Sequence, residues 1–234
     1  MKSILRLERS YDVERLLADL KIAEEQGKAH PHFGRYHDGG WSAIPLVSPG
    51  GRVDPDALRH AHGGYAKTPI LAKCPYFESI VDSFDCPKQR IRLMRLEPGT
   101  NIHEHRDPGD SWALGQVRLH IPIITHEEVY FYLDGQRVQM RPGELWYCDF
   151  SKPHRVENRS PIARIHFVLD LTISPSLRKL FPPESFTEHL RNWGYYCRFH
   201  AEESLRTLVQ ATGVARLRRL LRKPAAPKRA SSVA

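Results

Sequence analysis

The chain has 234 residues, of which 41% are hydrophobic, and this is enough to bury a core in one large domain or two small ones. Such a composition excludes a disordered polymer. The formal charge is +8, but residues 202–234 hold eight Lys/Arg and only two Glu, so most of the positive charge lies near the C-terminal end. A basic tail differs from a basic groove, and nucleic-acid binding is therefore not expected as the main function.

The lack of a recognisable targeting signal and the pattern of cysteines predict a cytoplasmic protein. No apolar run reaches the length of a membrane span, and the charged N-terminal stretch lacks the apolar segment of a signal peptide. The cysteines lie far apart without a Cys-x-x-Cys pair, so we expect reduced thiols that are mostly buried. They are Cys74, Cys86, Cys148 and Cys197.

The first part of the chain predicts a strand, two helices and a long loop. Residues 4–10 have the pattern of a short strand, and apolar residues at near-helical spacing follow, with Ser10 as a candidate N-cap. A segment rich in Gly, Pro and His comes next and contains one short strand at 41–47. A second helix is expected over PYFESIVDSF, with Pro75 near its start. The apolar residues of the first helix are Leu16, Leu17, Leu20 and Ile22.

Between residues 89 and 171 the sequence alternates polar and apolar residues in the period of two that is typical of strands. Gly, Pro, Asp and Asn separate the stretches, and Asp134-Gly135 predicts a hairpin because such a pair accepts the positive φ of the turn. Regular short strands of this kind predict a mainly β fold, either a sandwich or a double-stranded β-helix, which is a jelly-roll or cupin-like barrel. The stretches are QRIRLMRLEPG, GQVRLHIPIIT, EEVYFYLDGQRVQMRPG, ELWYCDF and ARIHFVLDL.

We expect the chain to be organised around this β region, residues 89–172, as its core. Residues 1–88 would pack on the barrel, and residues 173–222 would form a C-terminal helical region. Leucines follow one side of that predicted helix and arginines the other, which favours a leucine stripe packed on the barrel with the arginines in water. Residues 223–234 have the composition of a disordered basic tail, which could make a weak contact with an anionic partner.

Metal-binding side chains gather in the stretch NIHEHRDPGD, residues 101–110. His103, His105 and Asp107 fall on one alternation, so on an extended strand they would share a face. His154 lies in FSKPHRVEN, at the edge of a predicted strand. Two imidazoles and one carboxylate on one face of an iron ion leave the opposite positions open for substrate and dioxygen. His105, Asp107 and His154 are therefore candidate iron ligands.

Two further strands carry basic residues at alternate positions. Arg118 and His120 lie in VRLHIPI, and Arg164 and His166 lie in RIHFVLD. If these strands line the barrel, two arginines point into its interior, and burial of a guanidinium is costly unless an anion meets it. A dicarboxylate that chelates iron at one end and meets an arginine fork at the other would explain the pattern, and 2-oxoglutarate is such a molecule.

These segments together resemble the aspartyl/asparaginyl β-hydroxylase family, a group of Fe(II)- and 2-oxoglutarate-dependent oxygenases built on a double-stranded β-helix. The resemblance covers roughly residues 40–172 and includes GGWSAIPLVSPGG near its start. The layout is most similar to that of the free-proline cis-4-hydroxylases, which keep a complete His-x-Asp…His triad. The resemblance implies hydroxylation of an unactivated C–H bond with Fe(II), 2-oxoglutarate and O2, and release of succinate and CO2.

The family motifs carry over onto particular positions of this sequence. The resemblance implies that His105, Asp107 and His154 are the iron ligands and that Arg164 binds the distal carboxylate of 2-oxoglutarate. It also implies that Arg118 and His120 line the cosubstrate pocket. Some family members have Gly where Asp107 stands, so this chain fits the branch with three ligands. The implied small-molecule substrate is a free amino acid such as proline, or an aminoacyl group or peptide side chain.

Two other interpretations remain open at this point. In a cupin-type metal protein, His103, His105 and His154 would bind the metal without 2-oxoglutarate, and HRVEN would match the cupin His-x-x-x-Asn ending. That interpretation gives no reason for the interior arginines. In a non-catalytic β-helix, the basic C-terminal helix would instead contact an acidic partner or anionic lipid.

Four more residues are candidates for the substrate pocket. His166 shares the alternation of Arg164, and Trp146 precedes the strand of His154, so each could line the pocket or fill the core. Arg92 and Arg95 lie on the strand that enters the metal-binding stretch and could hold a substrate carboxylate.

Overall fold

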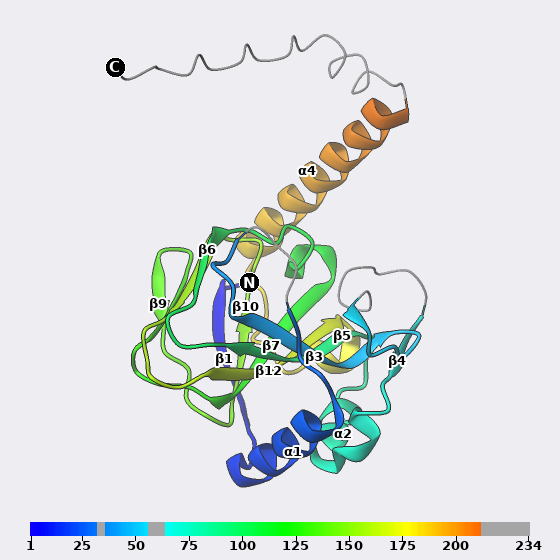
Figure 1. Ribbon diagram of the computed structural model, residues 1–234. Helices are drawn as coiled ribbons and strands as arrows, with labels where there is room; N and C mark the ends of the chain where they lie inside the picture. Colours follow the sequence, from blue (N-terminus) through cyan, green and yellow to red (C-terminus); the bar gives the residue numbers. More distant parts are fainter. Residues whose placement is uncertain (32–35, 56–63, 212–234) are drawn as a thin grey trace, which may run out of the picture.

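The computed structural model describes residues 1–31, 36–55 and 64–211, and its fold is mainly β, as predicted (Figure 1). The strands pair in antiparallel fashion in two sheets, one of eight strands and one of four. The large sheet has the order β1 (Ile4–Ser10), β10 (Glu144–Cys148), β7 (Gln116–Ile124), β12 (Arg164–Thr172), β5 (Lys88–Leu96), β3 (Trp41–Pro49) and β2 (His30–Pro31), with β4 (Tyr65–Lys67) paired to β3. The small sheet has the order β6 (Asn101–His105), β11 (His154–Asn158), β8 (Val129–Leu133) and β9 (Gln136–Val138).

The connections between the sheets are those of a double-stranded β-helix. From β5 onward the chain passes repeatedly between the sheets, so that β5, β7, β10 and β12 lie in the large sheet and β6, β8, β9 and β11 in the small one. Within the described residues the two sheets stay separate and do not close into a single hydrogen-bonded barrel. The N-terminal strands extend the large sheet, β1 at the edge of β10 and β3 at the edge of β5.

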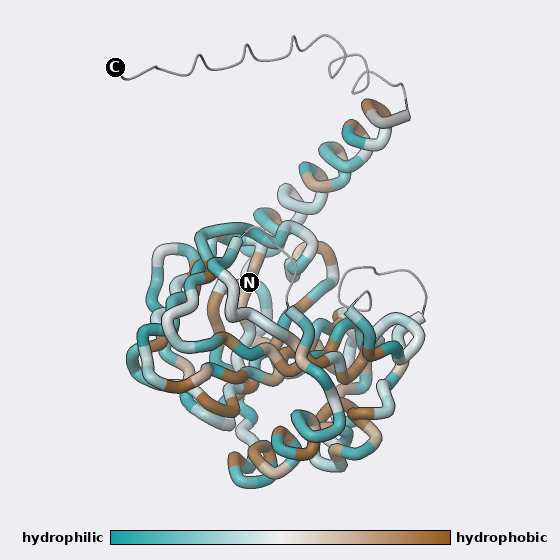
Figure 2. Tube along the Cα trace, viewed as in Figure 1, coloured by the Kyte–Doolittle hydropathy of each residue, from teal (hydrophilic) through white to brown (hydrophobic). Residues whose placement is uncertain are grey.

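The two faces of the large sheet have different chemistry because side chains alternate along each strand. The face packed against α1 (Val13–Gln26) and α2 (Pro75–Asp82) holds the main apolar core, in which Leu119 and Phe167 are completely buried beside Leu16 and Phe77. Brown, hydrophobic segments gather in this part of the molecule in Figure 2. The opposite face, toward the small sheet, carries the buried polar residues Arg92, Arg118, His120, Arg164, His166 and Asp170.

Of two local predictions, the N-cap of the first helix was wrong and the hairpin turn was confirmed. β1 continues through Ser10, so the N-cap of α1 is Asp12, whose carboxylate accepts from the amide of Arg15; the prediction of Ser10 was wrong. Between β8 and β9, Asp134 and Gly135 have φ values of 51° and 76°, which confirms the predicted hairpin turn. Two short 3₁₀ helices cover Leu71–Lys73 and Trp112–Leu114.

The C-terminal region holds α3 (Pro175–Arg178) and α4 (Phe186–Ala211), and α4 projects away from the sheets (Figure 1). Leu205 and Leu208 are 62% and 61% exposed, so the expectation that this leucine stripe packs on the barrel is not met for these two residues. The remainder of the predicted helix and the predicted tail at 223–234 lie outside the described residues. Among the described helices, none is both long and apolar enough to cross a membrane.

Candidate metal centre

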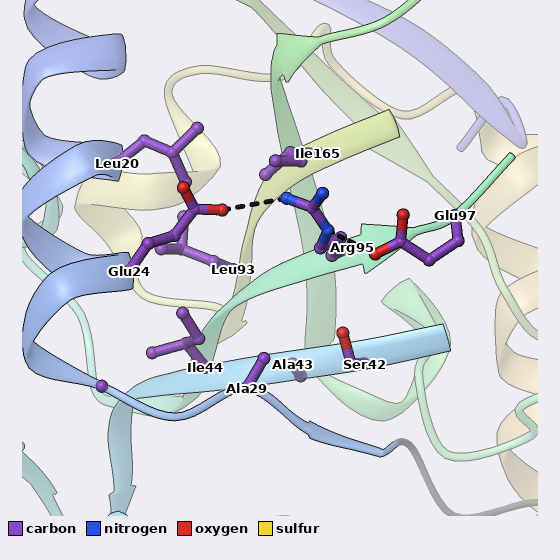
Figure 3. Close-up of a pocket in the computed structure, with 11 residues that line it drawn as sticks. Leu20, Glu24, Ala29, Ser42, Ala43, Ile44, Leu93, Arg95, Glu97 and Ile165 are labelled. Atoms are coloured by element: carbon purple, nitrogen blue, oxygen red, sulfur yellow. Dashed lines mark hydrogen bonds and ion pairs between the residues drawn. The ribbon is translucent and has the colours of Figure 1, made fainter. Parts of the chain in front are cut away.

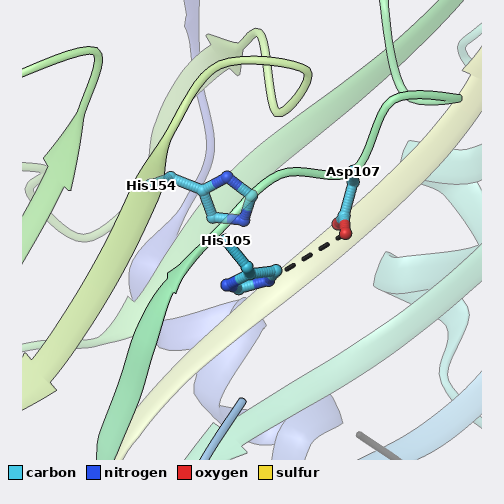
Figure 4. Close-up of side chains that lie close together, drawn as sticks. All are labelled: His105, Asp107 and His154. Carbon is cyan, nitrogen blue, oxygen red and sulfur yellow. Dashed lines mark ion pairs between the residues drawn. The ribbon is translucent and has the colours of Figure 1, made fainter. Parts of the chain in front are cut away.

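Three side chains that can bind a metal converge at one end of the space between the sheets (Figure 4). His105 ends β6, His154 begins β11, and the two are cross-strand partners. Asp107 follows β6 by two residues, and its amide donates to the carbonyl of Phe150 over 2.8 Å, which ties the loop after β6 to the segment before β11. One ligand atom of each of the three residues lies within 4.8 Å of the others.

The tautomers of both histidines follow from their hydrogen bonds. Nδ1 of His105 lies 2.8 Å from the carbonyl oxygen of His103, and Nδ1 of His154 lies 3.0 Å from that of Lys152. A carbonyl oxygen can only accept, so in each ring Nδ1 carries the proton and Nε2 presents a lone pair. Burial lowers the pKa of His154 to about 4, so its ring is neutral at neutral pH. Both rings are thus prepared to bind a cation through Nε2.

Asp107 supplies the anionic member of the triad. Burial opposes its ionisation, but the charge of Arg118 and the neighbouring imidazoles outweigh this and hold the pKa of Asp107 below its usual value. Nη1 of Arg118 donates to Oδ2 of Asp107 over 2.9 Å, while Oδ1 lies 3.9 Å from Nε2 of His105. One carboxylate oxygen therefore faces the histidines, and the other is held by the arginine.

His103 does not join this cluster, contrary to the alternation expected from the sequence. His154 pairs with His105, and Val156 pairs with Ile102. A step of two positions along β11 is therefore matched by a step of three positions along β6. This irregularity reverses the alternation between Ile102 and His105. The side chain of His103 is 55% exposed and binds Asp38 through Nε2 over 2.7 Å, whereas that of His105 is 6% exposed. The three-histidine set of a cupin-type site is therefore not formed.

A cavity between the sheets connects the triad with Arg164. Its polar lining consists of the triad, Arg118, His120 and Arg164. The rest of the lining is apolar or aromatic and is made of Trp41, Met94, Ile102, Phe131, Phe150 and Val156. Sites for small molecules commonly combine a few convergent polar groups with apolar walls in this way.

Arg164 is a buried cation that has no anionic partner among the described residues. Its Nη2 donates to Nδ1 of His166 over 3.0 Å, and it forms no ion pair within the part of the chain that the structure describes. Burial lowers the pKa of Arg164 to about 10, so the guanidinium is still charged at neutral pH. Its Nε has no hydrogen-bond partner among the described residues, and the same is true of Nε2 of His120 and of His166. The unpaired donors among these atoms, Nε of Arg164 and Nε2 of His166, favour an anionic ligand at this end of the cavity.

Arg118 is placed differently from Arg164. Its Nε and Nη2 contact the two carboxylate oxygens of Asp170 over 2.6 and 3.1 Å, and Nη2 also lies 2.5 Å from Asp110. With Asp107, three carboxylates thus surround one guanidinium. Arg118 and His120 line the cavity as the resemblance implied, but Arg118 is bound to the protein's own carboxylates instead of being free for a cosubstrate. Sequence reasoning missed Asp110 and Asp170, although Asp170 shares the alternation of Arg164 and His166.

The candidates for substrate binding are separated by the structure. Arg92 lies on the inner face and donates to Asp170 over 3.1 Å. Arg95 is three positions away and so lies on the opposite face, where it binds Glu24 and Glu97 in a pocket beside α1 (Figure 3). The expectation that Arg95 reaches the metal cavity is corrected by this odd spacing.

Trp146 and His166 both lie on the inner face of the large sheet. Trp146 packs against the inner apolar cluster and donates to Glu144 over 2.9 Å, and it does not line the metal cavity. His166 lies beside Arg164, and Nδ1 of His120 is 3.2 Å from its Nδ1. Burial holds the pKa of both histidines well below the usual value, so both rings are neutral.

The chain has recognisable relatives. It is 24% and 23% identical to L-proline cis-3-hydroxylases 1 and 2 of Streptomyces sp. over 165 and 163 residues. The alignments cover 68% of this chain and 57% and 56% of those relatives, so this chain spans little more than half of their length. These two relatives are cis-3-hydroxylases, whereas the motif layout favoured the cis-4 enzymes.

A structural relative and a family model complete the comparison. The non-heme α-ketoglutarate-dependent carbocyclase SnoK from nogalamycin biosynthesis is 11% identical with a TM-score of 0.50, over 73% of this chain and 79% of that one, which shows a common fold. The model of the aspartyl/asparaginyl β-hydroxylases matches residues 10–173, well over half of the sequence. The chain belongs to the aspartyl/asparaginyl β-hydroxylase family.

Proposed function

We propose that the protein is an Fe(II)- and 2-oxoglutarate-dependent oxygenase that hydroxylates an unactivated C–H bond of an amino acid, an aminoacyl group or a peptide side chain. The observation that carries this proposal is the presence of a His-Asp-His triad and a buried arginine without an anion in one cavity. In the balanced reaction, one atom of O2 enters the C–H bond and the other enters succinate, while CO2 leaves 2-oxoglutarate.

The triad fits a divalent iron ion. His105 and His154 would bind it through Nε2, because each Nδ1 is already occupied by a backbone carbonyl, and Asp107 would bind it through Oδ1. Three protein ligands leave the other coordination positions for small molecules. Bound there, Fe(II) supplies the activation of dioxygen that no amino-acid side chain provides.

Arg164 fits the distal carboxylate of 2-oxoglutarate. A carboxylate could accept from its unpaired Nε and from an adjacent Nη group in a two-point contact, which would neutralise the buried charge. His166 accepts from Arg164 at Nδ1, so its own proton lies on Nε2 and offers one more donor nearby. Because both neighbouring histidines are neutral, Arg164 is the principal positive charge for the cosubstrate.

The apolar walls of the cavity would exclude water from the reacting groups. Phe150 packs edge-on against His154 with 4.7 Å between ring centroids, and Tyr36 stacks on His105 at the same separation. Phe131 and Met94 cover more of the wall. Such a lining protects a reactive oxidant from side reactions with solvent.

A free amino acid, with proline favoured, is the proposed substrate. The support is the similarity to two enzymes that are named as L-proline hydroxylases. The described residues do not offer a further free arginine at the cavity for a substrate carboxylate, because Arg92 and Arg118 are both bound to Asp170. A carboxylate that is already esterified to a carrier, or part of a peptide, is therefore the second form of substrate to test.

Release of succinate tests the proposal. The purified protein would be incubated with Fe(II), 2-oxoglutarate, ascorbate and air, with L-proline, other amino acids, prolyl-carrier thioesters and short peptides in separate reactions. We expect one class to stimulate succinate formation and to gain the mass of one oxygen atom. Asp107→Ala should abolish both signals. If Fe(II) binds but no succinate forms with any substrate class, the proposal is overturned.

A further inference from the structure

We propose that Asp170 is a positioning residue: through Arg118 it holds Asp107 so that a single carboxylate oxygen faces the metal position. The inference rests on the proposed metal site. It goes beyond that site because Asp170 is not one of the three ligands and contacts Asp107 only through Arg118. It explains why a buried strand residue is acidic at a point where the sheet would otherwise accept an apolar side chain.

The contact between Asp170 and Arg118 is fixed by the sheet itself. The two residues are direct partners on the neighbouring strands β12 and β7. Both carboxylate oxygens of Asp170 are used, with Nε of Arg118 at 2.6 Å from Oδ1 and Nη2 at 3.1 Å from Oδ2. The side chains are 5% and 9% exposed. A planar guanidinium that is bound at two points has little freedom to rotate.

The remaining nitrogen of the same guanidinium, Nη1, orients the metal-binding carboxylate of Asp107. Nη1 donates to Oδ2 of Asp107 over 2.9 Å, and this leaves Oδ1 on the side of His105. The hydrogen bond from Arg118 directs Oδ2 toward the guanidinium, so Oδ1 is the oxygen that faces the metal position. Asp107 would then bind through one oxygen only, which keeps an additional coordination position open for the small molecules that must react there.

Asp170 also accepts a hydrogen bond from a second arginine, Arg92. Nη1 of Arg92 donates to Oδ2 of Asp170 over 3.1 Å, and Asp110 meets Nη2 of Arg118. These groups form a buried network that links β5, β7 and β12 to the metal-binding loop. A buried ion pair contributes little net stability compared with apolar packing, so the network is better explained by orientation of Asp107 than by stability.

Binding of Co(II) to the metal-free protein provides the test, because Co(II) reports both affinity and coordination geometry through its visible absorption. Asp170→Asn replaces one accepting oxygen by an NH2 group, which cannot accept from Arg118, and removes the negative charge. We expect its affinity for Co(II) to fall by about 10- to 100-fold and its Co(II) spectrum to change. Asp170→Glu keeps the charge but moves the carboxylate, so it separates position from net charge. It should also change the spectrum, with a smaller loss of affinity.

The matched control is Asp19→Asn. Asp19 is a buried carboxylate too, but it accepts from the amide of Phe77 beside the helices, on the other face of the large sheet. Its substitution should lower the stability and leave Co(II) affinity and spectrum unchanged. Circular dichroism would establish that each variant is folded, and the Glu variant serves if the Asn variant is not.

The outcomes separate this inference from the proposed function. Failure of the wild-type protein to bind Co(II) would overturn the metal site itself. If the wild type binds Co(II) and a folded Asp170→Asn or Asp170→Glu variant binds it with the same affinity and spectrum, the positioning role of Asp170 is overturned while the metal site stands. Loss of affinity with an altered spectrum supports the inference.

Discussion

Arg164 donates to Nδ1 of His166 over 3.0 Å, and this neutral ring is the only side-chain partner of its guanidinium within the described residues. Arg118, which lines the same cavity, is held by three carboxylates. The same cavity thus contains one arginine that is neutralised by the protein and one that is prepared for an external anion. This difference leads to opposite expectations for the two residues.

Substitution of Arg164 should increase the stability of the ligand-free protein. In Arg164→Met an unpaired buried charge is replaced by an apolar side chain of similar length, and we expect the free energy of unfolding in urea to rise by about 1–3 kcal/mol. The same variant should lose the thermal stabilisation that 2-oxoglutarate gives to the wild type. A large loss of stability in Arg164→Met would contradict the assignment of an unpaired cation.

Substitution of Arg118 should have the opposite effect. Arg118→Met leaves Asp107, Asp110 and Asp170 close together without their shared cation, and we expect the free energy of unfolding to fall by about 3–5 kcal/mol. Urea titration of both variants in the same buffer compares them directly. Equal effects of the two substitutions would show that the structure's distinction between the arginines is wrong.

The triad and the cupin-type alternative differ in the role of His103. Its side chain binds Asp38 at the surface, so His103→Ala should leave the affinity for Co(II) unchanged within about twofold. Asp107→Ala should lower that affinity by at least about 10-fold because an anionic ligand is lost. Isothermal titration of the metal-free proteins measures both. The reverse order of effects would favour the three-histidine site.

The pH dependence of stability should report the buried ring of His154. Its pKa in the folded protein, about 4, lies below the value of about 6.5 for an exposed histidine. Between these values the unfolded chain binds a proton that the folded protein excludes, so this contribution is complete above pH 6.5 and is lost as the pH falls toward 4. Between pH 7 and pH 5 the metal-free protein should lose about 2 kcal/mol through this residue.

His154→Gln provides the comparison for that pH effect. The variant lacks the titrating ring, so its free energy of unfolding in urea should fall less than that of the wild type between the two pH values. The difference between the two slopes is the contribution of His154. Identical slopes would show that the ring is not held neutral by burial.

Asn158, the last residue of HRVEN, should matter for stability and not for metal binding. Its amide donates to the carbonyls of Leu96 and Ile162 over 3.0 and 2.9 Å, and its Oδ1 accepts from the amide and hydroxyl of Ser160. Asn158→Ala leaves buried groups unpaired, and we expect a loss of about 2–3 kcal/mol in urea unfolding with unchanged Co(II) affinity. Asn101→Ala, which removes a partly exposed bond to Asp38, is the control and should cost about 0.5 kcal/mol or less.

Much of the fold could be predicted because the strands have clear alternation and the turn between β8 and β9 has the residues that its φ angles require. His105, Asp107 and His154 could be chosen as ligands from their residue types and from the family resemblance, whereas their close approach comes from the register of β6 and β11. The irregularity in β6 left no signal in the sequence, so alternation alone would put His103 on the face of His105, which the structure does not show. Residue spacing alone does, however, separate Arg92 from Arg95, since an odd separation on a regular strand means opposite faces.

The partners of the buried charges could not be predicted in the same way. Asp170 and Arg118 are 52 positions apart and meet only through the register of β7 and β12. Without that register, Arg118 and Arg164 look equivalent, because each precedes a histidine by two positions. Helix α4, Phe186–Ala211, lies within the predicted helical region 173–222, but its first half exposes large apolar residues that give no simple amphipathic pattern from which its start could be predicted.

The most direct test of the central claim is an anaerobic titration of the metal-free protein with Fe(II) and 2-oxoglutarate, followed by visible absorption. A 2-oxo acid chelated to Fe(II) gives a weak charge-transfer band, and we predict this band for the wild type. In Arg164→Met it should require a much higher concentration of 2-oxoglutarate, and in Asp107→Ala it should be lost. A protein that binds Fe(II) without giving the band, or a band that is insensitive to Arg164→Met, would contradict the account.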